Sequence, residues 1–515
     1  MAPDQFRTDT VDVVPAITDQ PLDRPQGRWQ RVSRASARDK WLWLLTSVGF
    51  AVPVIAYFIF VHRYGVNVVV NDQWSDVNLL GKAFSGHLTT SDLWAQHNEN
   101  RIFFPNLIVL LLGYGTRLNV HIEEYLNAVL LVGAILLLIW AHHRRSPRTP
   151  LLWYCPVVIL MLSWVQYENT LWGFQVQWYL VLICLAATLF VLDVSHLNWP
   201  MLTIAAAIAV VGSYSALQGL MIWPAGLILI LYRQRGLKLI GAWIVAGALT
   251  AALYFYNFDF SQLDSYRINP VLHPVFAIKV FFFSVGNIAG KPLPLRIFPA
   301  PSFDHPLLGT ANPWIIVFGI IVTVAAVLAV VKTGFRNAKN GAEALGVTLI
   351  VFAITFDALT AYGRGLYGYA GVSLSKYATF SLLTVVGIYL VVISRPVSDR
   401  VIASTPRPTH RGPTRSIMRS DLQRIFALAV RGLSILAICC VAIGVVSGYS
   451  NGLSEGRNDH AVQVNVTNYL RKLQMRKLQI PDSKVALLDP SESARATIKL
   501  IHVAERDKLS LFDQG

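Results

Sequence analysis

Four short polar segments interrupt the long apolar runs of this 515-residue sequence, and each carries side chains that can do chemistry. They span residues 71–76, 96–101, 166–175 and 363–377. Carboxylates of this kind can accept protons, and Arg and Lys side chains can bind phosphate. The candidate site residues in these segments are Asp72, Asp76, His97, Asn98, Glu99, Arg101, Glu168, Asn169, Gln175, Arg364, Lys376 and Tyr377.

Each segment also admits a purely structural interpretation. Asp72 can cap a helix next to the membrane, which is the commoner role of an isolated Asp in that position. Segment 96–101 can form a hydrogen-bonded surface turn or hold a metal ion, and Glu168 can pair with an Arg to join two loops. Arg364 and Lys376 can anchor the chain at the membrane interface, because long basic side chains reach from apolar surroundings to water.

The elements that must position these segments are membrane-spanning helices. Hydrophobic residues make up 54% of the chain and charged residues 14%, and the mean hydropathy is +0.48. A soluble domain carries about 25% charged residues, and several apolar runs reach the roughly 20 residues that cross a hydrocarbon core. The net charge of +15 comes largely from Arg and Lys beside apolar runs. That pattern orients membrane proteins and favours contact with membrane lipid over nucleic acid.

The basic segments predict which helix ends face the cytoplasm. They are the N-terminal tail 1–40, which we expect to be disordered, the connectors 142–148, 233–238 and 332–339, and the loop 396–424. Placing them in the cytoplasm leaves eleven spans, at about 41–62, 124–141, 150–165, 176–193, 200–213, 219–232, 238–256, 314–331, 344–361, 378–394 and 425–447. The apolar stretches 102–118 and 275–290 are then expected to lie in the outer interface. Counting both as spans gives a thirteen-span alternative, which moves several basic loops outside.

This topology puts all four polar segments on the extracytoplasmic side of the plasma membrane. The major outer loops are 63–123 and 257–313, and the C-terminal tail 448–515 is also outside. We expect that tail to be a small helical element, with an amphipathic stretch at 459–475 and a second helix near 491–505. Ionisable residues are nearly absent from the predicted spans, whereas ion-coupled transporters hold such residues near the midplane. The sequence therefore favours chemistry or recognition at the outer surface.

Residues 41–395 resemble the GT-C superfamily of membrane glycosyltransferases. Those enzymes have a cytoplasmic N-terminus, an essential Asp or Asp/Glu pair in a long loop after the first span, and another long outer loop after the seventh. Here Asp72 follows the first span, and 257–313 follows the seventh. Four motifs also look like those of a group of bacterial membrane proteins associated with this superfamily: Asp72-Gln73-Trp74, His97-Asn98-Glu99-Asn100-Arg101, Glu168-Asn169-x-Leu171-Trp172-Gly173-Phe174-Gln175 and Ser375-Lys376-Tyr377.

The resemblance implies transfer of a sugar from a polyprenyl-phosphate donor to an envelope glycan or lipid acceptor. Asp72 would accept the proton of the acceptor hydroxyl, while Arg364 and Lys376 would stabilise the departing phosphate. No carboxylate adjoins Asp72 as in the familiar pair, so its partner is Asp76, Glu99 or Glu168. The other candidates would bind substrate: His97, Asn98, Arg101, Asn169, Gln175 and Tyr377.

The sequence leaves three further points open. The chain lacks the Trp-Trp-Asp signature of oligosaccharyltransferases, which argues against protein N-glycosylation. No motif requires a metal, although a divalent cation is compatible with the resemblance. Two other functions stay open, namely a transporter or flippase of a lipid-linked glycan and a non-catalytic subunit of an envelope assembly complex.

Overall fold

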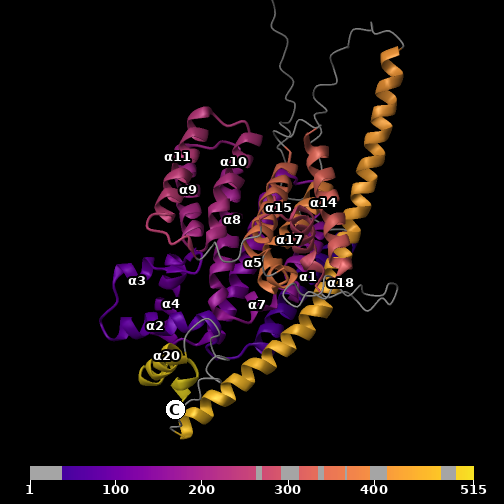
Figure 1. The fold of residues 1–515 in the computed structure, drawn as a ribbon. Coiled ribbons are helices and arrows are strands. Elements are labelled where there is room, and N and C mark those ends of the chain that lie inside the picture. Colours follow the sequence, from indigo (N-terminus) through magenta and orange to yellow (C-terminus); the bar gives the residue numbers. More distant parts are fainter. Residues whose placement is uncertain are drawn as a thin grey trace, which may run out of the picture.

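A computed structural model describes residues 37–261, 269–290, 312–334, 341–365, 368–394, 414–476 and 494–514. Most of the tail 1–40, much of loop 257–313 and most of loop 396–424 lie outside these residues. The predicted all-α architecture is confirmed, since helices make up nearly all of the described chain (Figure 1). Strands occur there only as a small hairpin, β1 (Gln96–His97) paired antiparallel with β2 (Asn100–Arg101).

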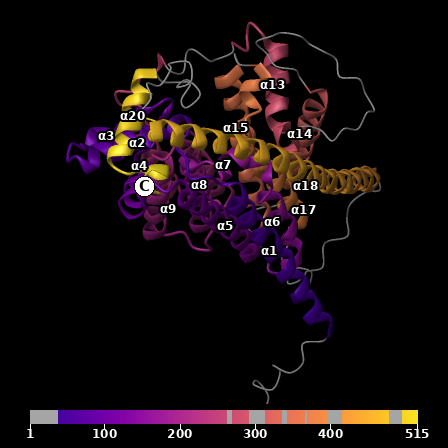
Figure 2. The same ribbon diagram turned by 90° about the horizontal axis from the view of Figure 1, so that it is seen from below.

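Nine helices in the described residues are long and apolar enough to cross a membrane. They are Lys40–Tyr64, Val120–Arg145, Leu151–Thr170, Gly173–Leu192, Leu237–Tyr254, Pro313–Gly334, Glu343–Arg364, Ser375–Ile393 and Arg431–Lys472. In the labels of Figures 1 and 2 they correspond, in that order, to α1 (Ala37–Tyr64), α5 (Val120–Arg145), α6 (Cys155–Met161) with α7 (Tyr167–Thr170), α8 (Val176–Leu192), α11 (Leu237–Tyr254), α14 (Pro313–Gly334), α15 (Glu343–Arg364), α17 (Ser375–Ile393) and α18 (Thr414–Arg476).

The other apolar helices are shorter. The predicted spans 200–213 and 219–232 correspond to α9 (Trp199–Ser213) and to η5 with α10 (Leu217–Tyr232). The two stretches expected in the interface correspond to α4 (Phe103–Thr116) and to α13 with η6 (Pro274–Ala289). At 1.5 Å per residue, the 14 residues of α4 reach about 21 Å, short of a hydrocarbon core of about 30 Å.

Helices α15 (Glu343–Arg364) and α17 (Ser375–Ile393) form the centre of the bundle. They cross in close contact because Gly346 and Gly387 face each other. A Cβ atom on Gly346 would lie 2.6 Å from the carbonyl oxygen of Gly387, and one on Gly387 would lie 2.5 Å from that of Gly346. Small residues allow such approach between membrane helices. This crossing fixes the two helices whose ends carry Arg364 and Lys376.

The last predicted span and the amphipathic stretch of the tail form one continuous helix, α18 (Thr414–Arg476), rather than two. Gly448, Gly452 and Gly456 would favour an interruption of the helix, because Gly is a poor helix former. They lie four residues apart, however, on one face of the continuous helix. A Cβ atom on Gly452 would lie 2.2 Å from the carbonyl oxygen of Trp164. The glycines therefore admit close packing against neighbouring helices.

The predicted second tail helix is present as α20 (Ala494–Arg506), followed by η9 (Ser510–Gln514). Figure 2 shows α20 beside α2 (Trp74–Phe84) and α18 crossing the molecule. These elements share a small apolar core that includes Trp74, Leu80, Leu470, Ile501 and Phe512. The end of α18, α20 and η9 thus pack with residues 66–120 as one unit.

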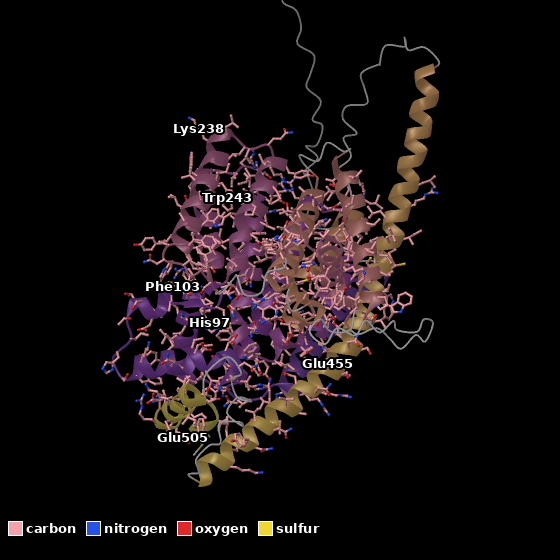
Figure 3. All side chains as sticks on the ribbon, in the orientation of Figure 1. His97, Phe103, Lys238, Trp243, Glu455 and Glu505 are labelled. Carbon is pink, nitrogen blue, oxygen red and sulfur yellow. The ribbon has the colours of Figure 1, made fainter. Side chains whose placement is uncertain are left out.

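The basic and polar segments lie at different ends of the bundle. In Figure 3, Lys238 lies at one end, whereas His97 and Glu505 lie toward the other. This arrangement meets the requirement of the predicted topology that basic connector 233–238 and polar segment 96–101 face opposite sides.

Candidate functional site

Asp72 lies in the 3-10 turn η1 (Asn71–Gln73), after the chain leaves α1 (Ala37–Tyr64). Gln73 and Trp74, which are buried next to Asp72, fix this turn. Neither η1 nor α2 has a side-chain cap at its N-terminus, so Asp72 does not play the capping role that is its structural alternative. Its side chain is 27% exposed and available to solvent or substrate.

The β1–β2 hairpin is held by Arg101. The backbone at Asn98 is left-handed, with φ of 50°, a conformation that Asn tolerates well. Arg101 donates hydrogen bonds from Nε to the carbonyl of Tyr254 (2.6 Å) and from Nη1 to that of Trp94 (2.8 Å). Its Nη2 donates to the carbonyl of Tyr256 at 2.6 Å. The donors of buried Arg101 are therefore used in hydrogen bonds to backbone carbonyls, and these bonds position the hairpin.

The hairpin brings His97 to Asp72. Nε2 of His97 lies 3.7 Å from Oδ2 of Asp72, an ion-pair distance beyond a direct hydrogen bond. Burial raises the pKa of Asp72, but His97, Lys376 and Arg364 together lower it further, so the pKa lies below its ordinary value. The ring of His97 packs edge-on against Phe174, with centroids 5.2 Å apart. Two of the other predicted polar segments, 96–101 and 363–377, thus act electrostatically on the Asp72 carboxylate.

Arg364, at the end of α15, forms an ion pair with Glu99 at the hairpin tip. The backbone carbonyl of Glu99 also accepts a hydrogen bond from the Tyr254 hydroxyl at 3.1 Å. Lys376 lies in the first turn of α17, with Nζ 5.8 Å from the centre of the Tyr377 ring. Within the described residues, no ion pair or hydrogen bond of the Lys376 ammonium is found. Its charge acts on the carboxylates of Asp72 and Glu168 and can also meet an anionic ligand.

Glu168 and Asn169 fix the start of α17 instead of facing Asp72. The carboxylate of Glu168 accepts a hydrogen bond from the backbone N–H of Lys376 at 2.8 Å. Nδ2 of Asn169 donates to the carbonyl of Lys376 at 2.8 Å and to Oγ1 of Thr379 at 2.7 Å. Gln175 is also buried, with 1% exposed surface. Glu168 and Asn169 thus hold the start of the helix on which Lys376 is placed.

A pair of buried carboxyl groups lies behind Asp72. Burial, followed by the charge of Asp72, raises the pKa of Asp76 well above its ordinary value. Glu123 in α5 (Val120–Arg145) is also buried, and its Oε2 accepts a hydrogen bond from Nε2 of Gln73 at 2.7 Å. Gln73 stands in the Asp72-Gln73-Trp74 motif but was not among the predicted site residues, and neither was Glu123. The signal was a pair of adjacent acidic residues, Glu123 and Glu124, at the outer end of a predicted span.

A cavity of about 600 Å³ lies beside the ion pair, between the spanning helices. Glu99, Asn100, Arg364 and Tyr377 contribute to its wall. Most of the remaining lining is apolar: Trp178, Leu217, Leu220, Met221, Pro224, Phe356 and Leu359. Leu359 is 53% exposed, so the cavity borders the outer surface of the bundle. Pockets of roughly 300–1,000 Å³ with few polar groups are typical ligand sites.

The arrangement contains a base, cations and an apolar cavity. No three His, Cys, Asp or Glu side chains in the described parts of the chain are arranged to hold a metal ion. The chemistry that the described side chains themselves support is proton transfer to Asp72 and anion binding by Arg364 and Lys376. No protein-family profile, curated protein or solved structure matches this chain.

Proposed function

We propose that this chain is a membrane glycosyltransferase of the GT-C type. It would transfer a sugar from a polyprenyl-phosphate donor to an envelope glycan or lipid acceptor on the extracytoplasmic side. One observation carries the proposal: Asp72 shares its surroundings with His97, Lys376 and Arg364, and Arg364 lines an apolar cavity among membrane helices. A base, two cations and a lipid-sized cavity are what such a reaction needs in one place.

The cavity suits the lipid part of the donor. Its lining is mostly apolar, and exposed Leu359 and Tyr362 connect it to the lipid-facing surface of α15. The phosphate would lie where Arg364 and Lys376 can reach it. Arg presents a planar fork to phosphate oxygens and Lys adds a mobile point charge.

The chemistry follows from these positions. As the acceptor hydroxyl oxygen bonds to the anomeric carbon of the sugar, its proton passes to Asp72. The bond between that carbon and the phosphate oxygen breaks, and the electron pair leaves with the polyprenyl phosphate. Arg364 and Lys376 stabilise the charge that develops on this leaving group. His97 holds the Asp72 carboxylate in its ionised form.

A transporter for a lipid-linked glycan is the second candidate, and Asp357 is the observation that favours it. This buried carboxylate in α15 accepts hydrogen bonds from the hydroxyls of Ser284 (2.9 Å) and Ser381 (2.7 Å). Buried ionisable groups in membrane helices are common in proton pathways. A proton gradient across proteoliposomes would drive glycolipid movement in this case, and no sugar would change its covalent partner.

Every donor of this class releases polyprenyl phosphate when its sugar is transferred. Binding of polyprenyl phosphate therefore tests the proposal without knowledge of the sugar. We expect undecaprenyl phosphate to bind the purified chain in nanodiscs, measured by native mass spectrometry. Arg364→Ala, which removes charge-assisted hydrogen bonds, should weaken binding by about tenfold or more. Arg364→Lys should restore only part of it.

The matched control is Arg117→Ala, which removes an exposed arginine stacked 5.0 Å over Phe84 outside the cavity. It should bind as the wild type does. Equal affinity in the wild type, Arg364→Ala and Arg117→Ala would reject the phosphate site and with it the glycosyltransferase proposal. Binding without transfer of any labelled sugar to membrane acceptors would favour the transporter or the non-catalytic subunit.

A further inference from the structure

Four arginines gather at the end of the bundle opposite the candidate site, and the proposed function does not use them. Arg144 and Arg145 come from the last turn of α5, and Arg233 and Arg235 follow α10 (Ile222–Tyr232). In the described part of the chain, the carboxylate that contacts them is Asp193. Nε of Arg233 donates to Oδ1 of Asp193 at 2.5 Å, and Nε of Arg145 lies 3.4 Å from the same oxygen.

Part of this cluster caps α8 (Val176–Leu192). Nη2 of Arg144 donates to the carbonyl of Phe190 at 2.7 Å. Nη1 of Arg235 donates to that of Ser195 at 2.8 Å. Cations at a helix C-terminus are favourable, but that terminus carries only about half a negative charge. The partners found for Arg144 and Arg235 are backbone carbonyls, which carry no full negative charge.

Arg144 and Arg235 each have a buried donor that is left over. Nε of Arg144 and Nε of Arg235 are buried and have no hydrogen-bond partner within the described residues. The side chains themselves are only half-buried, so a ligand can reach them from the surface. Like charges held together away from water raise the free energy of the folded state, and an anion between them would lower it.

We propose that this arginine cluster binds a phosphate group. Phosphate oxygens match the planar donor fork of Arg better than a single chloride or carboxylate oxygen does. The phosphate can belong to the head group of an anionic phospholipid or to a soluble phosphate. Basic pockets between membrane helices on the cytoplasmic side bind lipid head groups, and this is the end predicted to be cytoplasmic. The site is independent of sugar transfer.

The test uses the full chain in nanodiscs of phosphatidylcholine into which phosphatidylglycerol is titrated, with retained lipid counted by native mass spectrometry. A parallel series replaces phosphatidylglycerol with inorganic phosphate and follows the melting temperature. The double variant Arg144→Gln with Arg235→Gln removes the two leftover donors. Arg148→Gln is the matched control, because Arg148 is exposed on the next loop.

We expect the wild type and Arg148→Gln to retain phosphatidylglycerol in preference to phosphatidylcholine, and the double variant to lose about tenfold in affinity. Stabilisation by inorganic phosphate at equal concentration would identify a soluble ligand for the same site. If the double variant does not fold, the wild type alone tests the proposal. It should prefer phosphatidylglycerol to phosphatidylcholine, and salt should weaken that preference. Equal retention of both lipids, with no response to phosphate, would leave the cluster as a helix cap alone.

Discussion

The imidazole of His97 and the carboxylate of Asp72 lie 3.7 Å apart, although 24 residues of chain separate them. The two come from different structural elements, a hairpin and a 3-10 turn. Arg101 fixes the hairpin through backbone carbonyls, and buried Gln73 and Trp74 fix the turn. The position of each partner is therefore set by contacts outside the pair.

Asp72→Asn keeps the shape of the side chain and removes its charge. If Asp72 is the base, sugar transfer should fall by at least about a hundredfold, while binding of undecaprenyl phosphate is unchanged. Asp92→Asn, in the same loop but paired with Lys82 at 2.6 Å, is the control and should transfer at the wild-type rate. A wild-type rate in Asp72→Asn would move the search for a base to Glu99.

His97→Gln should change the pH dependence of transfer. The contact with His97 helps to hold the pKa of Asp72 below its ordinary value. Removing the imidazole raises the pKa of Asp72, so the acid limb of the kcat/KM profile should move to higher pH. His87→Gln, exposed in the loop that follows α2, should leave the profile in place. An unmoved limb in His97→Gln would mean that Asp72 does not control it.

Glu168 separates a scaffold role from a catalytic one. Glu168→Gln retains an oxygen that can accept the Lys376 N–H, so transfer should stay within a few-fold of wild type. Glu168→Ala removes the acceptor and should destabilise the fold by about 0.5–2 kcal/mol, as loss of a helix cap does. Thermal unfolding and transfer are measured on the same preparations. Loss of activity in Glu168→Gln at an unchanged Tm would instead make Glu168 a catalytic carboxylate.

Asp76→Asn should stabilise the protein at neutral pH. The folded state holds the pKa of Asp76 above its unfolded value of about 3.8. Between that value and the folded pKa, the folded state therefore binds more protons than the unfolded state does. The free energy of unfolding therefore falls with rising pH until the folded pKa is passed. Asn has no carboxyl group to titrate, so the Asp76→Asn variant does not lose this stability as pH rises. We expect the Tm of Asp76→Asn to exceed that of the wild type at pH 7 by roughly 2–4 °C, the effect of about 1 kcal/mol, and to match it near pH 4.

Two cysteine substitutions test the orientation and the number of spans. In a Cys439→Ser background, His502→Cys on α20 should react with an impermeant thiol reagent in intact cells, since His502 is 70% exposed. Lys238→Cys should react only after permeabilisation. Labelling of Lys238→Cys in intact cells would favour the thirteen-span topology, and failure of His502→Cys to label would reverse the predicted orientation.

Several site residues were predictable from the sequence because their chemistry is local. Asp72, His97, Glu99, Arg364 and Lys376 stand in short polar segments at the ends of apolar runs, and loop charge predicts that these segments share one side. Their structural neighbours were not predictable in this way. Nothing in the sequence distinguishes Glu168, which accepts an N–H at the start of α17, from Asp72, which caps nothing.

The sequence by itself determined that the chain is a helical membrane protein, because apolar length and basic loops act through the bilayer and not through contacts between particular residues. Only the tertiary structure decided which polar residues meet. Arg101 and Arg364 are equally basic in the sequence, yet one is buried against carbonyls and the other lines the cavity. That difference arises from the close crossing at Gly346 and Gly387 and from the fixed hairpin, which depend on contacts between segments far apart in the chain.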